Sequence, residues 1–302
     1  MLSGQAPQAD VSALYQRTRV KLLADLKSLA RYTCVQTITR AYRQPARKGL
    51  SLPCRSLLAN RERRAREPLT AWDRLRVDVT VASEKEIYTW AGAPRFQGSL
   101  FDVVGRFGRP LADGDFSGYL AGILENSARV VPHGTQIKNG RILVQIDYEV
   151  PLFASRYAIA TPTRAWTTAY SGSLLLDPDT GDLVKGSLAS SELPPETEQC
   201  AAFQDVEYAR VEIGGKSVLI PSATRLTIID REGGESVNSS SYAGCRAYTG
   251  QSSIRFDEAV DGDPSTAGAG IEAPPLALPP ESEFRVRILT RIDSNSFAAA
   301  IP

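Results

Sequence analysis

Histidine and methionine are almost absent from this chain of 302 residues, which contains one of each. Ser-His-Asp and Cys-His enzymes need a histidine, and the only one, His133, lies beside an expected turn. No GxSxG, HExxH or CxxC motif accompanies it. These absences argue against histidine- and metal-dependent catalysis, and we expect neither an enzyme nor a cofactor. A hydrolase that brings two carboxylates together from distant strands stays open as an alternative.

The sequence also lacks long apolar runs and any excess of charge. No stretch of 18 apolar residues occurs, so we expect no transmembrane segment. The 35 basic and 34 acidic residues leave a formal charge of +1, which gives no overall field toward nucleic acid or anionic lipid. The basic run from Arg61 to Arg66 is interrupted by Glu62 and holds no aromatic residue, which is typical of a solvated loop or helix face. We expect no nucleic-acid partner.

The N-terminal residues lack the charged and apolar regions of a signal peptide. Residues 5 to 9, Gln-Ala-Pro-Gln-Ala, are instead similar to the polar leader of a mature exported protein. Together with the cysteines, this pattern predicts a periplasmic or secreted protein whose export signal is absent from this chain. Either the signal was removed, or the start codon is misassigned.

Cys34, Cys54, Cys200 and Cys245 form an even set without the CxxC spacing that zinc ribbons need. We expect two disulfides. Of the three possible pairings we favour Cys34 with Cys54 and Cys200 with Cys245, because each pair brackets a loop or a short meander whose ends can meet. On the chain-entropy model each bond stabilises the fold by about 3 to 4 kcal/mol. Four buried, reduced cysteines that pack as small apolar side chains are the alternative.

Two segments have the periodicity of amphipathic helices. From residue 10 to residue 30, apolar side chains recur at spacings of three and four, with Asp10 placed as an N-cap. A second, short helix is predicted from Phe116 to Asn126. The Gly-rich segment from residue 105 to 114 lacks the spacing of a phosphate-binding loop and is typical of a connector.

Strands dominate the rest of the chain. Tyr32 to Arg43 is rich in β-branched and aromatic residues, and after residue 128 closely spaced strands alternate with turns such as Asn139-Gly140. Short connections give antiparallel meanders, so we predict a mainly β protein of the α+β class with roughly ten or more strands. Residues 44 to 68 are expected to form an irregular loop. The expected strands are 32–43, 75–81, 86–90, 142–150, 156–160, 165–176, 183–191, 203–213, 217–230, 235–247 and 249–256.

Residues 10 to 257 are predicted to form one β-rich domain after a disordered leader of residues 1 to 9. Residues 258 to 283 are rich in Pro and Ala, which predicts an extended linker. Residues 284 to 302 begin with an alternating, strand-like pattern, as the first strand of a truncated module would. We expect a monomer.

Aromatic residues in or beside the strands are the candidate ligand contacts. They either form the core under the two helices, or line a cleft between sheet and helices that admits an acyl chain or an apolar peptide. Periodicity does not separate these alternatives. The candidates for the cleft are Tyr32, Trp72, Tyr88, Trp90, Tyr148 and Trp166.

An amphipathic helix followed at once by a long strand, and then by an antiparallel sheet with inserted helices, resembles the lipoprotein-carrier superfamily of LolA, LolB and RseB. Segments such as Tyr32-Thr-Cys-Val-Gln-Thr and Tyr242-Ala-Gly-Cys-Arg also resemble an uncharacterised family of exported bacterial proteins, over roughly residues 10 to 257. The resemblance implies a strongly curved antiparallel sheet, an open half-barrel covered by an N-terminal helix and a second short helix. In the carriers an apolar cavity between sheet and helices binds acyl chains.

The resemblance implies a non-enzymatic carrier or binding protein for a lipid or a lipoprotein acyl chain. Through RseB it also implies the alternative of an envelope sensor or scaffold that binds another protein. In the exported family the cysteines of Tyr-Thr-Cys and Gly-Cys-Arg have mates placed much as Cys54 and Cys200 are here, which agrees with the local pairing. The chain departs from a lipoprotein pattern because it has no lipobox cysteine.

Overall fold

The computed structural model describes one large antiparallel sheet with a few helices, all within a compact unit, Met1–Gln251. The described residues are 8–28, 32–45, 52–82, 85–93, 95–104, 118–124, 129–155, 157–160, 165–190 and 193–247. The helices are α1 (Gln8–Ser28), α2 (Cys54–Ala59), α3 (Arg61–Arg64), α4 (Leu100–Val104) and α5 (Gly118–Leu124), with 3-10 turns η2 (Leu152–Ala154) and η3 (Pro195–Thr197). The strands are β1 (Tyr32–Arg43), β2 (Thr70–Ala82), β3 (Lys85–Trp90), β4 (Arg129–Lys138), β5 (Arg141–Val150), β6 (Ala158–Ala160), β7 (Ala165–Thr167), β8 (Tyr170–Leu176), β9 (Leu183–Ser190), β10 (Gln199–Ile213), β11 (Lys216–Asp230) and β12 (Glu235–Ala247).

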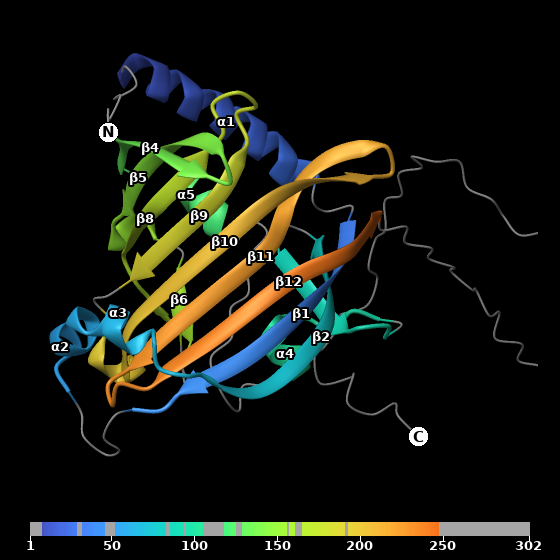
Figure 1. The fold of residues 1–302 in the computed structure, drawn as a ribbon. Coiled ribbons are helices and arrows are strands. Elements are labelled where there is room, and N and C mark those ends of the chain that lie inside the picture. The colour runs from blue at the N-terminus through green and yellow to red at the C-terminus, as the bar shows by residue number, and fades with distance from the viewer. Residues whose placement is uncertain are drawn as a thin grey trace, which may run out of the picture. The chain divides into compact units, whose positions relative to one another are not determined.

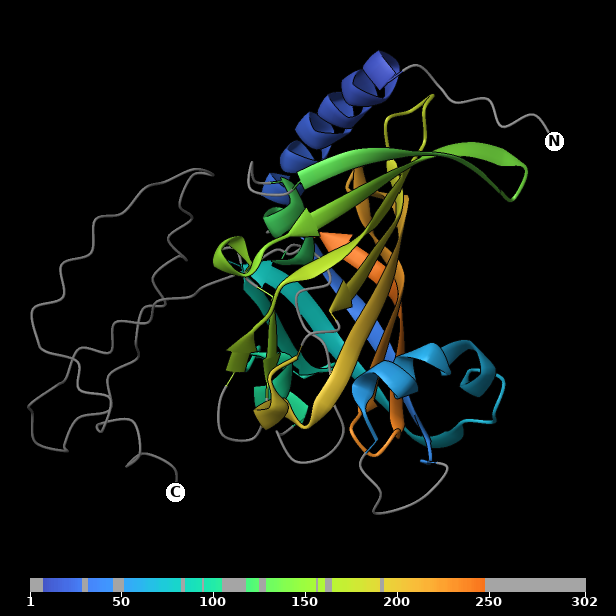
Figure 2. The ribbon, with the colours of Figure 1, turned by 90° about the vertical axis from the view of Figure 1, so that its left-hand side faces the viewer.

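The ten strands of the large sheet are hydrogen-bonded in the order β3–β2–β1–β12–β11–β10–β9–β8–β5–β4. The first long strand, β1, therefore lies beside the last, β12. The edge strands β3 and β4 do not pair with each other, so within the described residues the sheet curves strongly but stays open (Figure 2). The predicted mainly β, half-barrel architecture is confirmed. Strands β6 and β7 form a separate two-stranded sheet.

The two faces of the large sheet differ in what covers them. Strand β4 is the next strand after β3 in the sequence, but the two strands form opposite edges of the sheet. The chain between them therefore has to cross the sheet. Helices α4 and α5 belong to this crossing, and they lie on the same face as β6 (Figure 2). We call this face the interior face. The opposite, outer face shows bare strands, with α2 and α3 at one end (Figure 1).

Turn residues at the predicted hairpins have the required conformations. Asn139 and Gly140, between β4 and β5, have φ values of 52° and 76°. A two-residue type I′ turn requires a positive φ at both positions, which Asn-Gly adopts readily. The predicted Asn139-Gly140 turn is confirmed.

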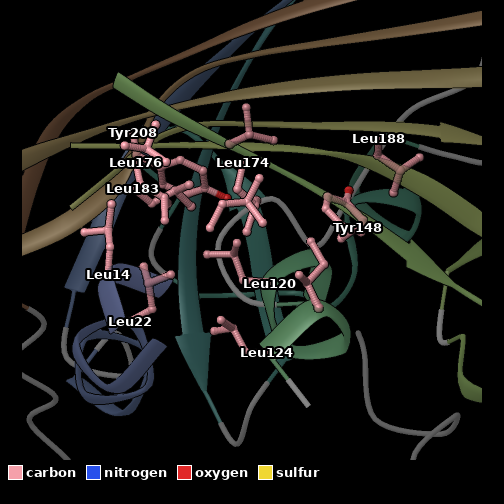
Figure 3. Close-up of a cluster of buried hydrophobic side chains, with 14 of the residues drawn as sticks. Leu14, Leu22, Leu120, Leu124, Tyr148, Leu174, Leu176, Leu183, Leu188 and Tyr208 are labelled. Carbon is pink, nitrogen blue, oxygen red and sulfur yellow. The ribbon is translucent and has the colours of Figure 1, made fainter. Parts of the chain in front are cut away.

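Apolar side chains from helices and strands meet on the interior face in two clusters. In the first, named the α5 cluster, Leu14 and Leu22 of α1 and Leu120 of α5 are buried against the sheet (Figure 3). In the second, named the α4 cluster, Leu100 of α4 is buried against β1, β2 and β3. The helix predicted from residue 10 to 30 is confirmed as α1, although it begins at Gln8 rather than behind Asp10, and the helix predicted from Phe116 to Asn126 is confirmed as α5. Helix α4 was not predicted. The sheet contributes Val144, Ile146, Tyr148, Val150, Tyr170, Leu174, Leu176, Leu183, Leu188, Val206, Tyr208 and Leu219 to the α5 cluster.

The segment from residue 44 to 68 is not wholly irregular, as the sequence had suggested, but contains α2 and α3. Leu57 of α2 is buried on the outer face with Ile229, which anchors these short helices to the sheet. The basic run is only partly solvated. Arg64 is buried and donates a hydrogen bond to the carbonyl oxygen of Gln44 at 3.2 Å, and the Arg61 guanidinium lies 3.5 Å from the centre of the Phe203 ring.

The predicted cysteine pairing is wrong. Cys34 is bonded to Cys245, and Cys54 to Cys200, across sequence separations of 211 and 146 residues. The local pairing assumed that neighbours in sequence close the loops, whereas the pairing of β1 with β12 brings Cys34 beside Cys245. The second bond ties the start of α2 to β10. All four cysteines are thus in disulfides, as expected.

Several predicted segments lie outside the described residues. These are residues 1 to 7 of the leader predicted at 1 to 9, the connector at 105 to 114, the strand at 249 to 256, the linker at 258 to 283 and the tail at 284 to 302. Residues 8 and 9 of the predicted leader are helical.

The disulfide pairing can be tested by proteolysis without reduction, followed by mass spectrometry of the linked peptides. We expect peptides that join Cys54 to Cys200 and Cys34 to Cys245, and a fragment that links Cys34 to Cys54 would contradict the structure.

Replacing Cys54 and Cys200 together by serine should lower the free energy of unfolding by about 2 to 5 kcal/mol, because the unfolded chain loses a long-range constraint. Chemical denaturation measures this change.

A buried ion pair between β1 and β12 provides a second test. Arg43 and Glu235 stand opposite each other in the register, and their side chains are only 6% and 4% exposed. Glu235→Ala would leave the guanidinium buried without its counter-charge, which costs about 3 to 5 kcal/mol of unfolding free energy. The matched control Glu207→Ala removes the partner of Lys138 from an exposed pair and should cost no more than about 1 kcal/mol. Equal losses in the two variants would contradict this account.

Candidate functional site

The interior face is the candidate ligand site, because the apolar side chains of both clusters project from it. Apart from α1, the covers over this face are short. Helix α4 has five residues and α5 has seven, while β6 and β7 have three each. Such short elements are not stable alone, so their structure depends on contact with the sheet. They are therefore the elements that can separate from the sheet while its hydrogen-bond ladder stays intact.

Helix α5 lies close to the sheet at Gly122. A Cβ atom at this position would lie 2.7 Å from the hydroxyl oxygen of Tyr170, which is closer than side-chain atoms normally come. The next residue, Ile123, is fully buried in the α5 cluster. A glycine followed by a buried isoleucine thus seats the helix directly on the interior face.

A buried polar strip on the central strands adjoins the apolar side chains of the interior face. Gln36 stands between Cys34 and Ile38, whose side chains belong to the α4 cluster. Its amide nitrogen donates to the hydroxyl groups of Ser240 at 3.2 Å and Tyr242 at 3.0 Å, while Oε1 has no hydrogen-bond partner among the described residues. The cross-strand register continues this strip through Arg40, Gln204, Thr224, Asn238 and Ser240, all of which are buried.

The six aromatic residues proposed as ligand contacts do not share one cluster. Tyr32 and Tyr88 are buried together in the α4 cluster, and Tyr148 belongs to the α5 cluster, where its hydroxyl donates to the carbonyl oxygen of Ser187 at 2.6 Å. Trp166 lies on β7 and is half-buried.

The two remaining tryptophans are at the surface. Trp72 is 48% exposed and Trp90 is 42% exposed, and the Arg40 guanidinium lies 4.9 Å from the Trp72 ring centre. A role for any of the six in ligand binding stays a prediction.

Sequence reasoning missed Gln36, although a polar residue at an apolar position of an alternating strand was the available signal.

The only histidine is placed at the exposed edge strand β4. His133 Nδ1 lies 2.6 Å from an Asp147 carboxylate oxygen, and the other oxygen accepts a hydrogen bond from Gln145 at 2.7 Å. Within the described residues no hydroxyl or thiol is hydrogen-bonded to His133, so the pair lacks the nucleophile that a catalytic triad requires.

The carboxylate of Asp177 has a structural role. Asp177 accepts hydrogen bonds from the backbone N–H groups of Asp179 at 2.8 Å and Thr180 at 3.1 Å, which closes the turn between β8 and β9. Across the described ranges, no group of three His, Cys, Asp or Glu side chains is placed to hold a metal ion. None of the described helices is both long and apolar enough to cross a bilayer.

Helix α1 is attached to the sheet by an ionic network at its outer side. Arg210 on β10 contacts Asp25 of α1 at 3.0 Å and Asp182 at 2.7 Å, and Lys21 of α1 contacts Asp182 at 2.9 Å. Burial alone would raise the pKa of Asp182, but hydrogen bonds from Arg210 and Lys21 outweigh it and hold the pKa below its ordinary value of 3.8. Asp182 is therefore a stable anion that anchors α1, and not a general acid.

Comparison with known proteins gives distant structural likenesses, among them two solved structures. No family model and no curated protein matches the chain. A DUF1329 family protein from Desulfovibrio piger aligns with 80% of this chain and 95% of its own, at 9% identity and a TM-score of 0.37. A structure described as an outer membrane lipoprotein-sorting protein domain, from Vibrio parahaemolyticus, aligns with 77% of this chain and 93% of its own, at 8% identity and a TM-score of 0.35. Both TM-scores lie below 0.5, so the function proposed below rests on this chain's own geometry.

The acid dependence of stability tests the attachment of α1. Because the pKa of Asp182 is lower in the folded than in the unfolded chain, its stabilising contribution is complete above the ordinary carboxyl pKa and is lost as the pH falls through the folded value. Asp182→Asn should reduce the steepness with which the free energy of unfolding falls in acid. The exposed neighbour Asp179→Asn serves as control and should keep the wild-type slope. Equal slopes for wild type and Asp182→Asn would contradict the role of this network.

Proposed function

We propose that this protein is a non-enzymatic, extracytoplasmic binding or carrier protein for an amphiphilic ligand, with a lipid or lipoprotein acyl chain bound at the interior face. The observation that carries the proposal is the open, strongly curved sheet whose apolar interior face is covered by short elements such as α5. Displacement of such a cover exposes leucine, valine and tyrosine side chains to a hydrocarbon chain without breaking strand pairs. Burial of each methylene of that chain contributes about 0.8 kcal/mol.

The polar strip supports an amphiphilic ligand rather than a pure hydrocarbon. A buried acceptor without a donor, such as Oε1 of Gln36, costs about 1 to 3 kcal/mol relative to a satisfied one. A ligand whose head group carries a hydroxyl or amide N–H would supply that donor while its chain lies against the apolar clusters. The two disulfides support an oxidising, extracytoplasmic compartment.

Binding of a fluorescent fatty-acid probe to delipidated protein tests the proposal. We expect saturable binding at one site with blue-shifted emission, because the probe enters an apolar environment. The absence of saturable binding, or binding equal to that of the unfolded chain, would refute the carrier function.

A variant of the cover sharpens the test. Ile123→Ala removes fully buried atoms that hold α5 on the sheet, so the displaced state becomes more populated and the apparent affinity for the probe rises, about tenfold for each 1.4 kcal/mol. Val20→Ala on the exposed side of α1 is the matched control and should bind the probe as the wild type does. An unchanged affinity in Ile123→Ala would show that α5 does not cover the site.

Two exposed apolar residues favour a second candidate function, docking to another envelope protein. In η2, directly after β5, Leu152 is 58% exposed and Phe153 is 91% exposed. A photo-crosslinking residue in place of Phe153 should then form an adduct with one protein partner in the envelope, whereas the same residue at Val20 should not. Absence of any adduct at position 153 would leave the carrier function alone.

A further inference from the structure

The outer face carries a hollow that the proposed carrier function does not use. Its volume is about 490 Å³, and it lies over β2, β1 and β12, on the opposite side of the sheet from α4 and α5. We call it the arginine hollow. Its lining residues are Val35, Thr37, Arg74, Arg76, Ala243 and Gly244.

The register explains why a hollow with two arginines forms here. Arg74 and Arg76 are two residues apart on β2, so both side chains leave the same face of the sheet. Thr37 stands opposite Arg76 on the neighbouring strand β1. The floor is open at β12, where a Cβ atom added to Gly244 would meet only a methyl group of Val35, at 3.8 Å. Long cationic side chains thus border a floor of small ones.

The charge of the hollow is not compensated within the described residues. Arg74 and Arg76 are exposed, and neither forms an ion pair there. The nearby carboxylates are engaged elsewhere: Asp73 binds Arg40, and Asp78 lies 3.7 Å from Arg246 and accepts a hydrogen bond from the backbone N–H of Gly92. Two guanidinium groups therefore stand beside a hollow, and no carboxylate among the described residues neutralises them.

The chemistry of the lining defines the ligand. Two guanidinium groups match a phosphate group, to which arginine donates paired hydrogen bonds. Thr37 offers a hydroxyl for polar groups, while Val35 and Ala243 offer small apolar contacts that suit the C–H face of a sugar. None of the described residues that line the hollow is aromatic, so among them a nucleotide base finds no ring on which to stack. A recess also suits a discrete molecule better than the flat surface of a membrane.

We propose that the arginine hollow binds a phosphorylated saccharide. Its phosphate lies between the guanidinium groups of Arg74 and Arg76, and its sugar lies over Val35 and Ala243 beside the Thr37 hydroxyl. This site is independent of the interior face, so its ligand and the acyl ligand do not compete.

Calorimetric titration with glucose 6-phosphate, glucose, inorganic phosphate and anionic phospholipid vesicles tests the proposal. We expect one glucose 6-phosphate per protein, weaker binding of inorganic phosphate, and no binding of glucose or vesicles. Binding of inorganic phosphate as tight as that of the sugar phosphate would overturn the saccharide assignment. Binding to vesicles, or to none of the four probes, would overturn the site.

Three variants separate charge from shape. Arg74→Gln with Arg76→Gln should weaken glucose 6-phosphate binding at least tenfold, whereas Arg129→Gln removes an exposed charge of the outer face at β4 and should bind as the wild type does. Ala243→Leu keeps both arginines but fills the hollow, and it should weaken binding as well. Unchanged affinity in either the double variant or Ala243→Leu, with an unaltered melting temperature as evidence of folding, would refute the proposal.

Discussion

The pairing of β1 with β12 is the constraint on which the rest of this structure depends. It adds β1, β2 and β3 to the sheet next to β12, at one end of the meander from β8 to β12, whereas β5 and β4 are added next to β8 at the other end. Strands β3 and β4 therefore form opposite edges of the sheet. The chain then has to cross the sheet between these edges, and the crossing carries α4 and α5 onto the interior face. The same pairing aligns Cys34 with Cys245 and Arg43 with Glu235, which fixes the register covalently and electrostatically.

The two faces of the sheet are suited to different ligands because strand side chains alternate. On the interior face, leucine, valine and tyrosine side chains pack under elements that are too short to be stable alone. On the outer face, the same strands present arginine, threonine and serine to solvent, and small residues of β12 leave a hollow among them. One sheet thus carries an apolar surface under displaceable covers and a cationic recess that is open to solvent.

The helices differ in how firmly they are held, and the difference follows from their contacts. Helix α1 combines buried leucines with an ionic network through Arg210, and α2 is tied to β10 by a disulfide. Helix α5 is held by the packing of buried side chains such as Ile123 and by hydrogen bonds from Arg19 and Tyr15 of α1 to the carbonyl oxygens of Leu124, at 2.7 Å, and Ile123, at 3.5 Å. Neither a disulfide nor strand pairing holds α5, so its displacement would leave the sheet and its two disulfides intact.

Local chemistry in the sequence determined many of the elements: alternation predicted the long strands, Asn139-Gly140 predicted a hairpin, and apolar spacing predicted α1 and α5. Helices α2, α3 and α4 were missed because they are too short to show a period. The strand predicted from residue 165 to 176 is two strands, β7 and β8, in different sheets. The partners of the cysteines were decided only by tertiary structure, since loop entropy favours near neighbours whereas strand order brings distant ones together. The same holds for the candidate sites: the sequence left an apolar core and an apolar cleft as alternatives, and the burial of Gln36 and the meeting of Arg76 with Thr37 and Gly244 depend on which strands pair, and in what register.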